Sequence, residues 1–173
     1  MQNRRGLFAG MQSGRLSGFV PYKGTKDLPN AGRISRFIRN FVDVKVALCQ
    51  FSMEWEAAAR NLRRAEELVA QAGADLALLP EMFATGFVTE PWRTALPDEE
   101  ELLAWMRRTA RRYATALAGS AVVRSGDRFA NRFFFVRPAG GAERYDKRHL
   151  FSIGGEDAHF VAGRRRVVVE YGG

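Results

Sequence analysis

The stretch Leu76-Ala-Leu-Leu-Pro-Glu-Met-Phe83 decides the fold of this chain. Its first four residues and the preceding Asp75 form a nearly all-apolar run, Asp75–Leu79. Such a run predicts a strand covered on both faces. Glu81 follows directly, so one ionisable group stands just beyond the strand. Because ligands bind at the carboxyl ends of parallel strands in α/β sheets, Glu81 is the first candidate functional residue.

The segments before this run predict a strand and a helix. Val44–Phe51 is a weakly alternating apolar run, typical of a buried strand. Glu54–Ala72 has apolar residues at helical spacing, acidic residues in its first turn and Gly73 just past its end. The order strand, helix, strand predicts the α/β class with a parallel strand pair.

The segments after the run predict a second helix. Asp98 is the expected N-cap, with Glu101 at the third helical position. The predicted buried face of this helix consists of Leu103, Met106, Ala110, Tyr113 and Leu117.

A hairpin and further strands are expected beyond that helix. Leu117–Arg124 and Arg128–Val136 are strand-like and are joined by a short Ser-Gly-Asp turn, which indicates a hairpin. Ala142–Asp146 predicts a short strand, residues 152–163 a glycine-containing loop, and Arg166–Tyr171 the start of one more strand.

The charge distribution argues against nucleic acid as a partner. The net charge is +8, but residues 1–42 carry eight basic residues and one acidic residue, whereas residues 43–173 carry 19 basic and 18 acidic residues. Residues 43–173 are thus nearly neutral, and the positive charge belongs to residues 1–42, the basic leader. The leader is expected to be disordered or to result from a misassigned start codon. Within it, Ile34–Phe41 could form at most a short helical turn. No apolar run is long enough to span a bilayer, so no membrane association is expected.

Cysteine and histidine content exclude two further kinds of site. Cys49 is the single cysteine, so no intramolecular disulfide can form and a reducing, cytoplasmic location is expected. Its place in an apolar strand favours a buried structural thiol over a catalytic thiolate. His149 and His159 combine with it in no zinc-binding pattern, and no metal is expected.

Three charged residues are candidates for acyl-transfer chemistry. Glu81 could act as a general base or merely cap a backbone amide. Lys147 follows Tyr145-Asp146 and could stabilise an oxyanion, or it could be a solvated lysine. Glu156 could support Lys147 through a charged hydrogen bond or serve as a turn acid. The local pattern does not decide between these alternatives.

Taken together, the segments closely resemble the carbon–nitrogen hydrolase (nitrilase) superfamily. The resemblance rests on Val44–Gln50, Leu78–Phe87 and Tyr145–Phe151, followed by Gly155-Glu156 and Ala162-Gly163. It covers about residues 43–173, so this segment is expected to be the N-terminal part of such a domain. The branch that it most resembles is the omega-amidases, which release ammonia from the terminal amide of small 2-oxo acid amides.

The resemblance implies a fold and a site. The family fold is an αββα sandwich, usually assembled as a homodimer, of which this chain would form an incomplete version. The resemblance implies Glu81 as the general base, Lys147 as the oxyanion-stabilising cation and Glu156 as the second glutamate that positions the lysine or the substrate. It implies no cofactor and no metal. Phe83 and Phe87 could line the pocket or belong to the core.

The resemblance also implies that the chain is truncated. In the family, the nucleophilic cysteine lies beyond the lysine, after a strand like Val167–Gly172, and the 173 residues end before it. Cys49 matches a first-strand position and cannot replace that nucleophile. The expectation is therefore an amidase-family chain without amide hydrolysis of its own. The alternative is a non-catalytic remnant or interaction module that pairs with a full-length homologue.

Overall fold

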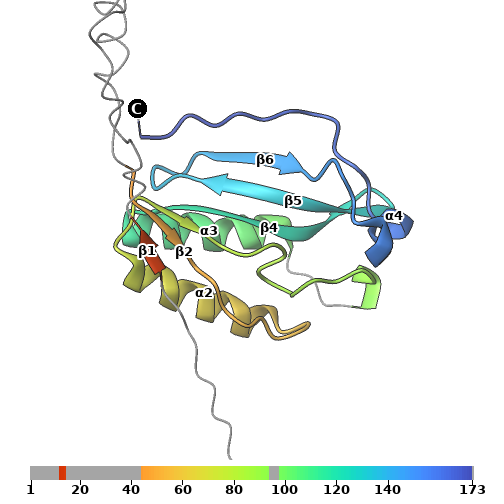
Figure 1. Ribbon diagram of the computed structural model, residues 1–173, viewed down its shortest axis with the longest axis horizontal. Coiled ribbons are helices and arrows are strands. Elements are labelled where there is room, and N and C mark those ends of the chain that lie inside the picture. The colour runs from red at the N-terminus through yellow and green to blue at the C-terminus, as the bar shows by residue number, and fades with distance from the viewer. Residues whose placement is uncertain (1–11, 15–43, 94–97, 173) are drawn as a thin grey trace, which may run out of the picture.

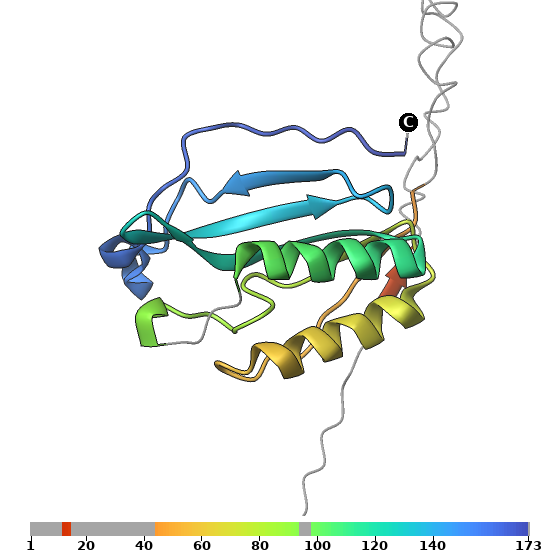
Figure 2. The same ribbon diagram turned by 180° about the vertical axis from the view of Figure 1, so that it is seen from behind.

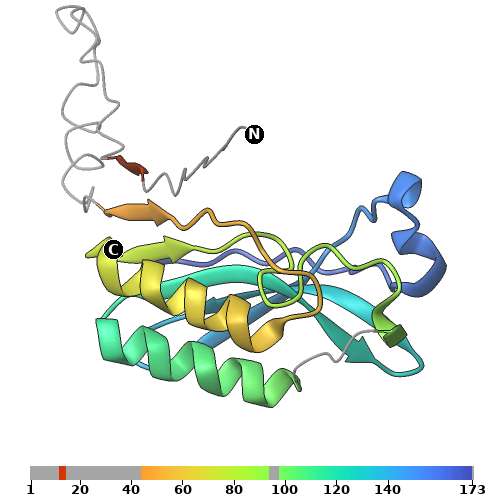
Figure 3. The same cartoon turned by 90° about the horizontal axis from the view of Figure 1, so that it is seen from below.

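The computed structural model describes residues 12–14, 44–93 and 98–172, which form one mixed sheet with helices on one face (Figure 1). The strand order is β1-β2-β3-β4-β5-β6. Helices α2 and α3 lie side by side on one face of this sheet (Figure 3). The C-terminal segment lies beyond the other face (Figures 1 and 2). The predicted α/β class is confirmed, and one sheet with one helical layer matches an incomplete αββα sandwich.

The predicted β-helix-β unit is present with shorter elements. Strand β2 (Val46–Leu48) pairs in parallel with β3 (Leu76–Leu78), and helix α2 (Ala58–Ala72) connects them. As predicted, Gly73 ends the helix in the left-handed conformation. The start of the helix differs from the prediction, because the buried Asn61 side chain bonds both backbone groups of Glu54 and holds that residue in a turn outside the helix. The acidic residues therefore lie outside the first helical turn.

The second helix, α3 (Glu99–Tyr113), leads into β4 (Ala116–Ser125), which pairs in parallel with β3. Asp98 is the N-cap, as predicted, and its carboxylate accepts hydrogen bonds from the N–H groups of Glu100 and Glu101. Leu117 belongs to β4 and not to the buried face of the helix, because α3 ends at Tyr113 and the chain reverses at Ala114 in the left-handed conformation.

Two further strands extend the sheet beyond β4 by antiparallel pairing. Strand β4 pairs with β5 (Arg128–Val136), and β5 pairs with β6 (Ala142–Asp146), so both the predicted hairpin and the predicted short strand are confirmed. Alternate residues of β4 and β5 face opposite sides of the sheet. Leu117, Ala121, Ala130 and Phe134 belong to the core under the helices. The neighbouring positions, such as Ser120 and Asn131, point to the opposite face.

The segment after β6 departs from the prediction in two places. The predicted loop at 152–163 contains two short helices, η3 (Ser152–Gly154) and α4 (Glu156–His159). The predicted strand Arg166–Tyr171 is wrong, since the segment joins no strand of the sheet and side chains hold it instead. Val169 and Tyr171 pack on an apolar cluster of the open sheet face, and the Tyr171 hydroxyl donates a hydrogen bond to the carbonyl of Asp75.

Of the leader, residues 1–42, the structure describes Gln12–Gly14, which form β1 and pair antiparallel with β2. The sequence did not predict this strand. The rest of the leader, including the predicted helical turn at Ile34–Phe41, lies outside the described residues. Among the described helices, none combines the length and apolar character needed to cross a membrane.

Candidate active site

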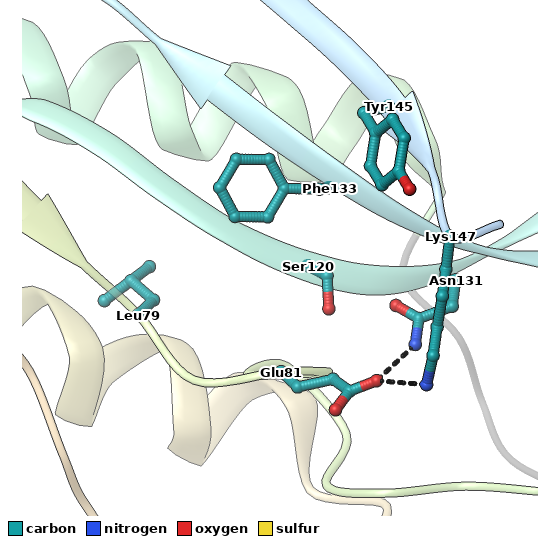
Figure 4. A pocket seen from close by; sticks show the side chains of 7 residues that line it. All are labelled: Leu79, Glu81, Ser120, Asn131, Phe133, Tyr145 and Lys147. Atoms are coloured by element: carbon teal, nitrogen blue, oxygen red, sulfur yellow. Dashed lines mark hydrogen bonds and ion pairs between the residues drawn. The ribbon is translucent and has the colours of Figure 1, made fainter. Parts of the chain in front are cut away.

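Glu81 lies in a tight loop at the carboxyl end of β3. The loop is fastened to the neighbouring strand β4, where the Ser120 hydroxyl and carbonyl oxygens accept hydrogen bonds of 3.0 and 3.1 Å from the N–H groups of Met82 and Phe83. Met82 adopts a φ of 50°, an unusual value for a residue with a side chain. These contacts fix the backbone on one side of Glu81 and direct its carboxylate toward the open face of the sheet (Figure 4).

Lys147 is positioned by two backbone hydrogen bonds. Its N–H donates to the carbonyl of Asn131 on β5, and its own carbonyl accepts from the N–H of Gly163, each at 2.9 Å. Gly163 approaches so closely that a Cβ atom there would lie 2.0 Å from the carbonyl oxygen of Asp146. The lysine is therefore held between β5 and the segment that follows α4.

Glu156 is the first residue of α4 and is fully buried. Its Oε2 accepts a hydrogen bond of 2.6 Å from the N–H of Phe151 and lies 2.9 Å from Nζ of Lys147. A buried carboxylate needs such partners, because desolvation of an unpaired charge is very costly.

The structure thus brings together all three residues that the sequence singled out. Nζ of Lys147 lies 2.8 Å from Oε1 of Glu81 and 2.9 Å from Oε2 of Glu156. The Glu81 side chain is 50% exposed, whereas that of Lys147 is 27% exposed. Glu81 therefore faces solvent at the mouth of the site, and the pair behind it is more deeply enclosed.

Sequence reasoning missed one member of this cluster, Asn131. Its Nδ2 donates a hydrogen bond of 2.6 Å to Oε1 of Glu81 (Figure 4). It also donates one of 3.2 Å to Oε1 of Glu156. The available signal was a single uncharged polar residue in a strand whose other residues are apolar or arginine, and the structure shows that this position is only 3% exposed.

A pocket of about 270 Å³ opens beside the charged cluster. Apolar and aromatic side chains line it together with polar and charged ones, and Figure 4 shows how they surround it. The lining residues are Leu79, Glu81, Ser120, Asn131, Phe133, Tyr145 and Lys147. Phe83 is fully buried in the core under the helices, and Phe87 packs against Phe151 with ring centroids 6.0 Å apart. Neither phenylalanine lines this pocket.

The charges of Lys147 and Glu156 stabilise each other. Partial burial lowers the pKa of Lys147, but hydrogen bonds and charges from Glu81 and Glu156 outweigh it and raise that pKa above its usual value. Burial raises the pKa of Glu156, but hydrogen bonds from the Phe151 N–H, Lys147 and Asn131, with the charge of Lys147, lower it overall. Both groups therefore stay charged at neutral pH.

The other candidate residues lie apart from this cluster. Cys49 is buried in the core under the helices, as predicted, and burial raises the pKa of its thiol to about 11. His159 packs edge-on against the Trp92 ring at 4.1 Å. Within the described ranges, no three His, Cys, Asp or Glu side chains form a group that could hold a metal ion.

Sequence comparison identifies relatives of this chain. The sequence profile of the carbon-nitrogen hydrolase family matches residues 45–172. Omega-amidase YafV of Yersinia enterocolitica is 40% identical over 131 residues, which cover 75% of this chain and 51% of the relative. Omega-amidase YafV of Escherichia coli K12 is 36% identical with the same coverage. The chain therefore spans about half the length of the curated relatives it matches.

Solved structures agree with this result. XC1258 from Xanthomonas campestris, a CN-hydrolase superfamily protein with an arsenic adduct in its active site, superposes with a TM-score of 0.69 at 35% identity over 74% of this chain and 49% of that one. An amidase mutant from Nesterenkonia sp. AN1, with acrylamide added at its active site cysteine, gives 0.66 at 25% identity over 74% of this chain and 53% of that one. Profile, relatives and structures agree, and the chain belongs to the carbon-nitrogen hydrolase family.

Proposed function

We propose that this chain supplies the base and the oxyanion-stabilising cation of an omega-amidase-like hydrolase acting on terminal amides of small 2-oxo acid amides. The observation that carries the proposal is the contact of Lys147 Nζ with Glu81 at 2.8 Å and Glu156 at 2.9 Å beside a pocket. The names of the relatives support the choice of an amide substrate.

The geometry suits amide hydrolysis by a cysteine that comes from outside the described residues. Glu81 takes the thiol proton, the thiolate attacks the amide carbonyl, and Lys147 stabilises the oxyanion. The proton held by Glu81 passes to the departing nitrogen, which leaves as ammonia and gives a thioester. Glu81 then deprotonates a water molecule, which releases the acid and regenerates the thiol. The net reaction converts amide and water to carboxylic acid and ammonia.

The 173-residue chain by itself is expected to release no ammonia from 2-oxoglutaramate. Its single cysteine, Cys49, is only 5% exposed and does not line the pocket. Loss of a covalent nucleophile lowers a hydrolytic rate by about a millionfold. Ammonia release that is abolished in Glu81→Gln would contradict this expectation.

A fusion tests the proposed function directly. Residues 44–172 would be joined to the part of the Yersinia enterocolitica relative that lies outside the matched residues. The fusion is expected to hydrolyse 2-oxoglutaramate, and Glu81→Gln or Lys147→Ala should each lower kcat by at least about a thousandfold. Matched controls are Glu67→Gln, at an exposed pair, and Lys45→Ala, whose ammonium contacts the carbonyl of Gly73. A folded fusion without activity, or equal losses in the controls, would refute the proposal.

A further inference from the structure

Asn131 lies at an unusual place for a primary amide. It is in the middle of β5, opposite Val122 of β4, on the sheet face that points away from α2 and α3. Only 3% of its surface is exposed, although Arg132, the next residue along the strand, is charged. Burying an amide there is costly unless its hydrogen-bonding groups are satisfied, so its contacts are informative.

Asn131 contacts all three charged residues of the site. Its Nδ2 donates to Oε1 of Glu81 at 2.6 Å and to Oε1 of Glu156 at 3.2 Å. Its backbone carbonyl accepts the N–H of Lys147 at 2.9 Å. A side-chain amide carries two N–H bonds, so a separate N–H is available for each carboxylate.

These contacts distinguish the two oxygens of the Glu81 carboxylate. Oε1 accepts hydrogen bonds from both Asn131 and Lys147, at 2.6 and 2.8 Å. Within the described part of the chain, no side chain or backbone group donates to Oε2. Because the side chain is half exposed, Oε2 is the oxygen free to exchange a proton with a bound reactant.

The same arrangement leaves one N–H of Lys147 available. An ammonium group has three donors, and two of them are directed at Glu81 and Glu156. If Glu81 rotated away, Lys147 would lose one anchor and the direction of the third N–H would no longer be fixed. Asn131 prevents that rotation, because it holds the same Glu81 oxygen from β5.

We propose that Asn131 is a positioning residue that fixes Oε1 of Glu81 against Lys147, so that Oε2 of Glu81 and the third N–H of Lys147 are presented to the substrate. The roles of base and oxyanion donor rest on the proposed function, whereas the positioning itself does not. Asn131 touches no reacting atom in this scheme and acts through Glu81 and Lys147.

The test is NMR on the 173-residue chain labelled with ¹⁵N-lysine. The chain has four lysines, Lys23, Lys26, Lys45 and Lys147, so the ammonium signal of Lys147 is assignable from Lys147→Arg. Asn131→Ala should make hydrogen exchange at the Lys147 ammonium at least about tenfold faster, the effect expected on loss of a charge-assisted hydrogen bond. It should also shift the pKa of Lys147 downward toward its usual value.

Asn61→Ala is the matched control. Asn61 is also a buried asparagine, but its side chain bonds the backbone of Glu54 and Ala84, away from Lys147. This variant should lower stability and leave the Lys147 exchange rate and pKa unchanged. If Asn131→Ala does not fold, Asn131→Ser, which keeps one O–H donor, should show a smaller change in the same direction.

A folded Asn131→Ala or Asn131→Ser chain with wild-type exchange and pKa at Lys147 would overturn the proposal and make Asn131 only a satisfied buried group. Equal changes in Asn61→Ala would do the same, because they would reflect general loosening. None of these readouts depends on amide hydrolysis. Failure of the positioning proposal is therefore distinguishable from failure of the proposed function, which the activity of the fusion decides.

Discussion

The ammonium nitrogen of Lys147 lies 2.9 Å from Oε2 of Glu156, a carboxylate whose side chain is 0% exposed. A buried ion pair of this kind is weak evidence for net stability, because desolvation offsets much of the attraction. Removing one partner is different, since it leaves the other charge without compensation. Substituting either residue of the pair is therefore expected to lower the stability of the folded chain, even if the intact pair adds little to it.

Glu156→Gln should be strongly destabilising. In the variant, Glu81 is the only carboxylate left to pair with Lys147. An uncharged amide replaces the carboxylate that now accepts hydrogen bonds from the Phe151 N–H and the Lys147 ammonium. We expect a loss of about 3 kcal/mol in the free energy of unfolding, measured by urea denaturation at pH 7. Glu67→Gln, which removes an exposed pair with Arg64, should change stability by less than about 0.5 kcal/mol. Equal effects would contradict the assignment of Glu156 as a buried ion-pair partner.

The stability of the chain should depend on pH through this pair. The folded-state pKa of Glu156 lies below its usual 4.5, so its contribution is complete above about pH 4.5 and is lost as pH falls through the lower folded-state value. The pKa of Lys147 lies above 10.5, so its contribution is complete below that pH and is lost as pH rises through the higher folded-state value. We expect a plateau of the melting temperature between these limits.

Thermal melts across the pH range check this expectation. Glu156→Gln should show a shallower acid limb than the wild type, because one carboxylate with a depressed pKa has been removed. Identical acid limbs in the two proteins would show that Glu156 does not contribute to acid unfolding.

Two catalytic candidates were predictable from sequence for a simple reason. Glu81 and Lys147 each follow a strand-forming run, and the position just beyond a strand is visible without knowledge of tertiary structure. Asn131 was not visible in this way, because its partners Glu81 and Glu156 lie 50 and 25 residues away along the chain. Only the pairing of β4 and β5 places it between them.

For Arg166–Tyr171 the sequence predicts a strand that the structure does not contain. Its β-branched residues favour extended backbone, and on that basis a strand was predicted. An extended segment becomes a strand only when its backbone forms hydrogen bonds with a neighbouring strand, and the local sequence does not specify that neighbour. In the structure, Val169 and Tyr171 instead pack their side chains on the open sheet face.

Gly163 should be required for the position of Lys147. A Cβ atom at residue 163 would lie 2.0 Å from the carbonyl oxygen of Asp146, a backbone atom that cannot move without displacing the end of β6. Gly163→Ala should therefore cost about 3 kcal/mol or more in the free energy of unfolding. It should also accelerate hydrogen exchange at the Gly163 N–H, which bonds the carbonyl of Lys147.

Gly126→Ala is the matched control for this prediction. Gly126 has a φ of 61° but open space around its Cα, so alanine there should cost only about 1–2 kcal/mol of backbone strain. Denaturation curves of the two variants measure the difference. A Gly163→Ala variant that is as stable as Gly126→Ala would show that the close approach to Asp146 is not maintained in solution.

Cys49 should be unreactive until the chain unfolds. Its thiol is 5% exposed among core residues, and burial raises its pKa to about 11, so little thiolate is present at pH 8 in the folded state. We expect a disulfide reagent such as DTNB to modify no thiol in the native chain within minutes and one thiol per chain in 8 M urea. The labelling rate at intermediate urea should rise with the unfolded fraction. Immediate stoichiometric labelling of the native chain would place Cys49 at an accessible surface and would reopen the question of a catalytic role for this thiol.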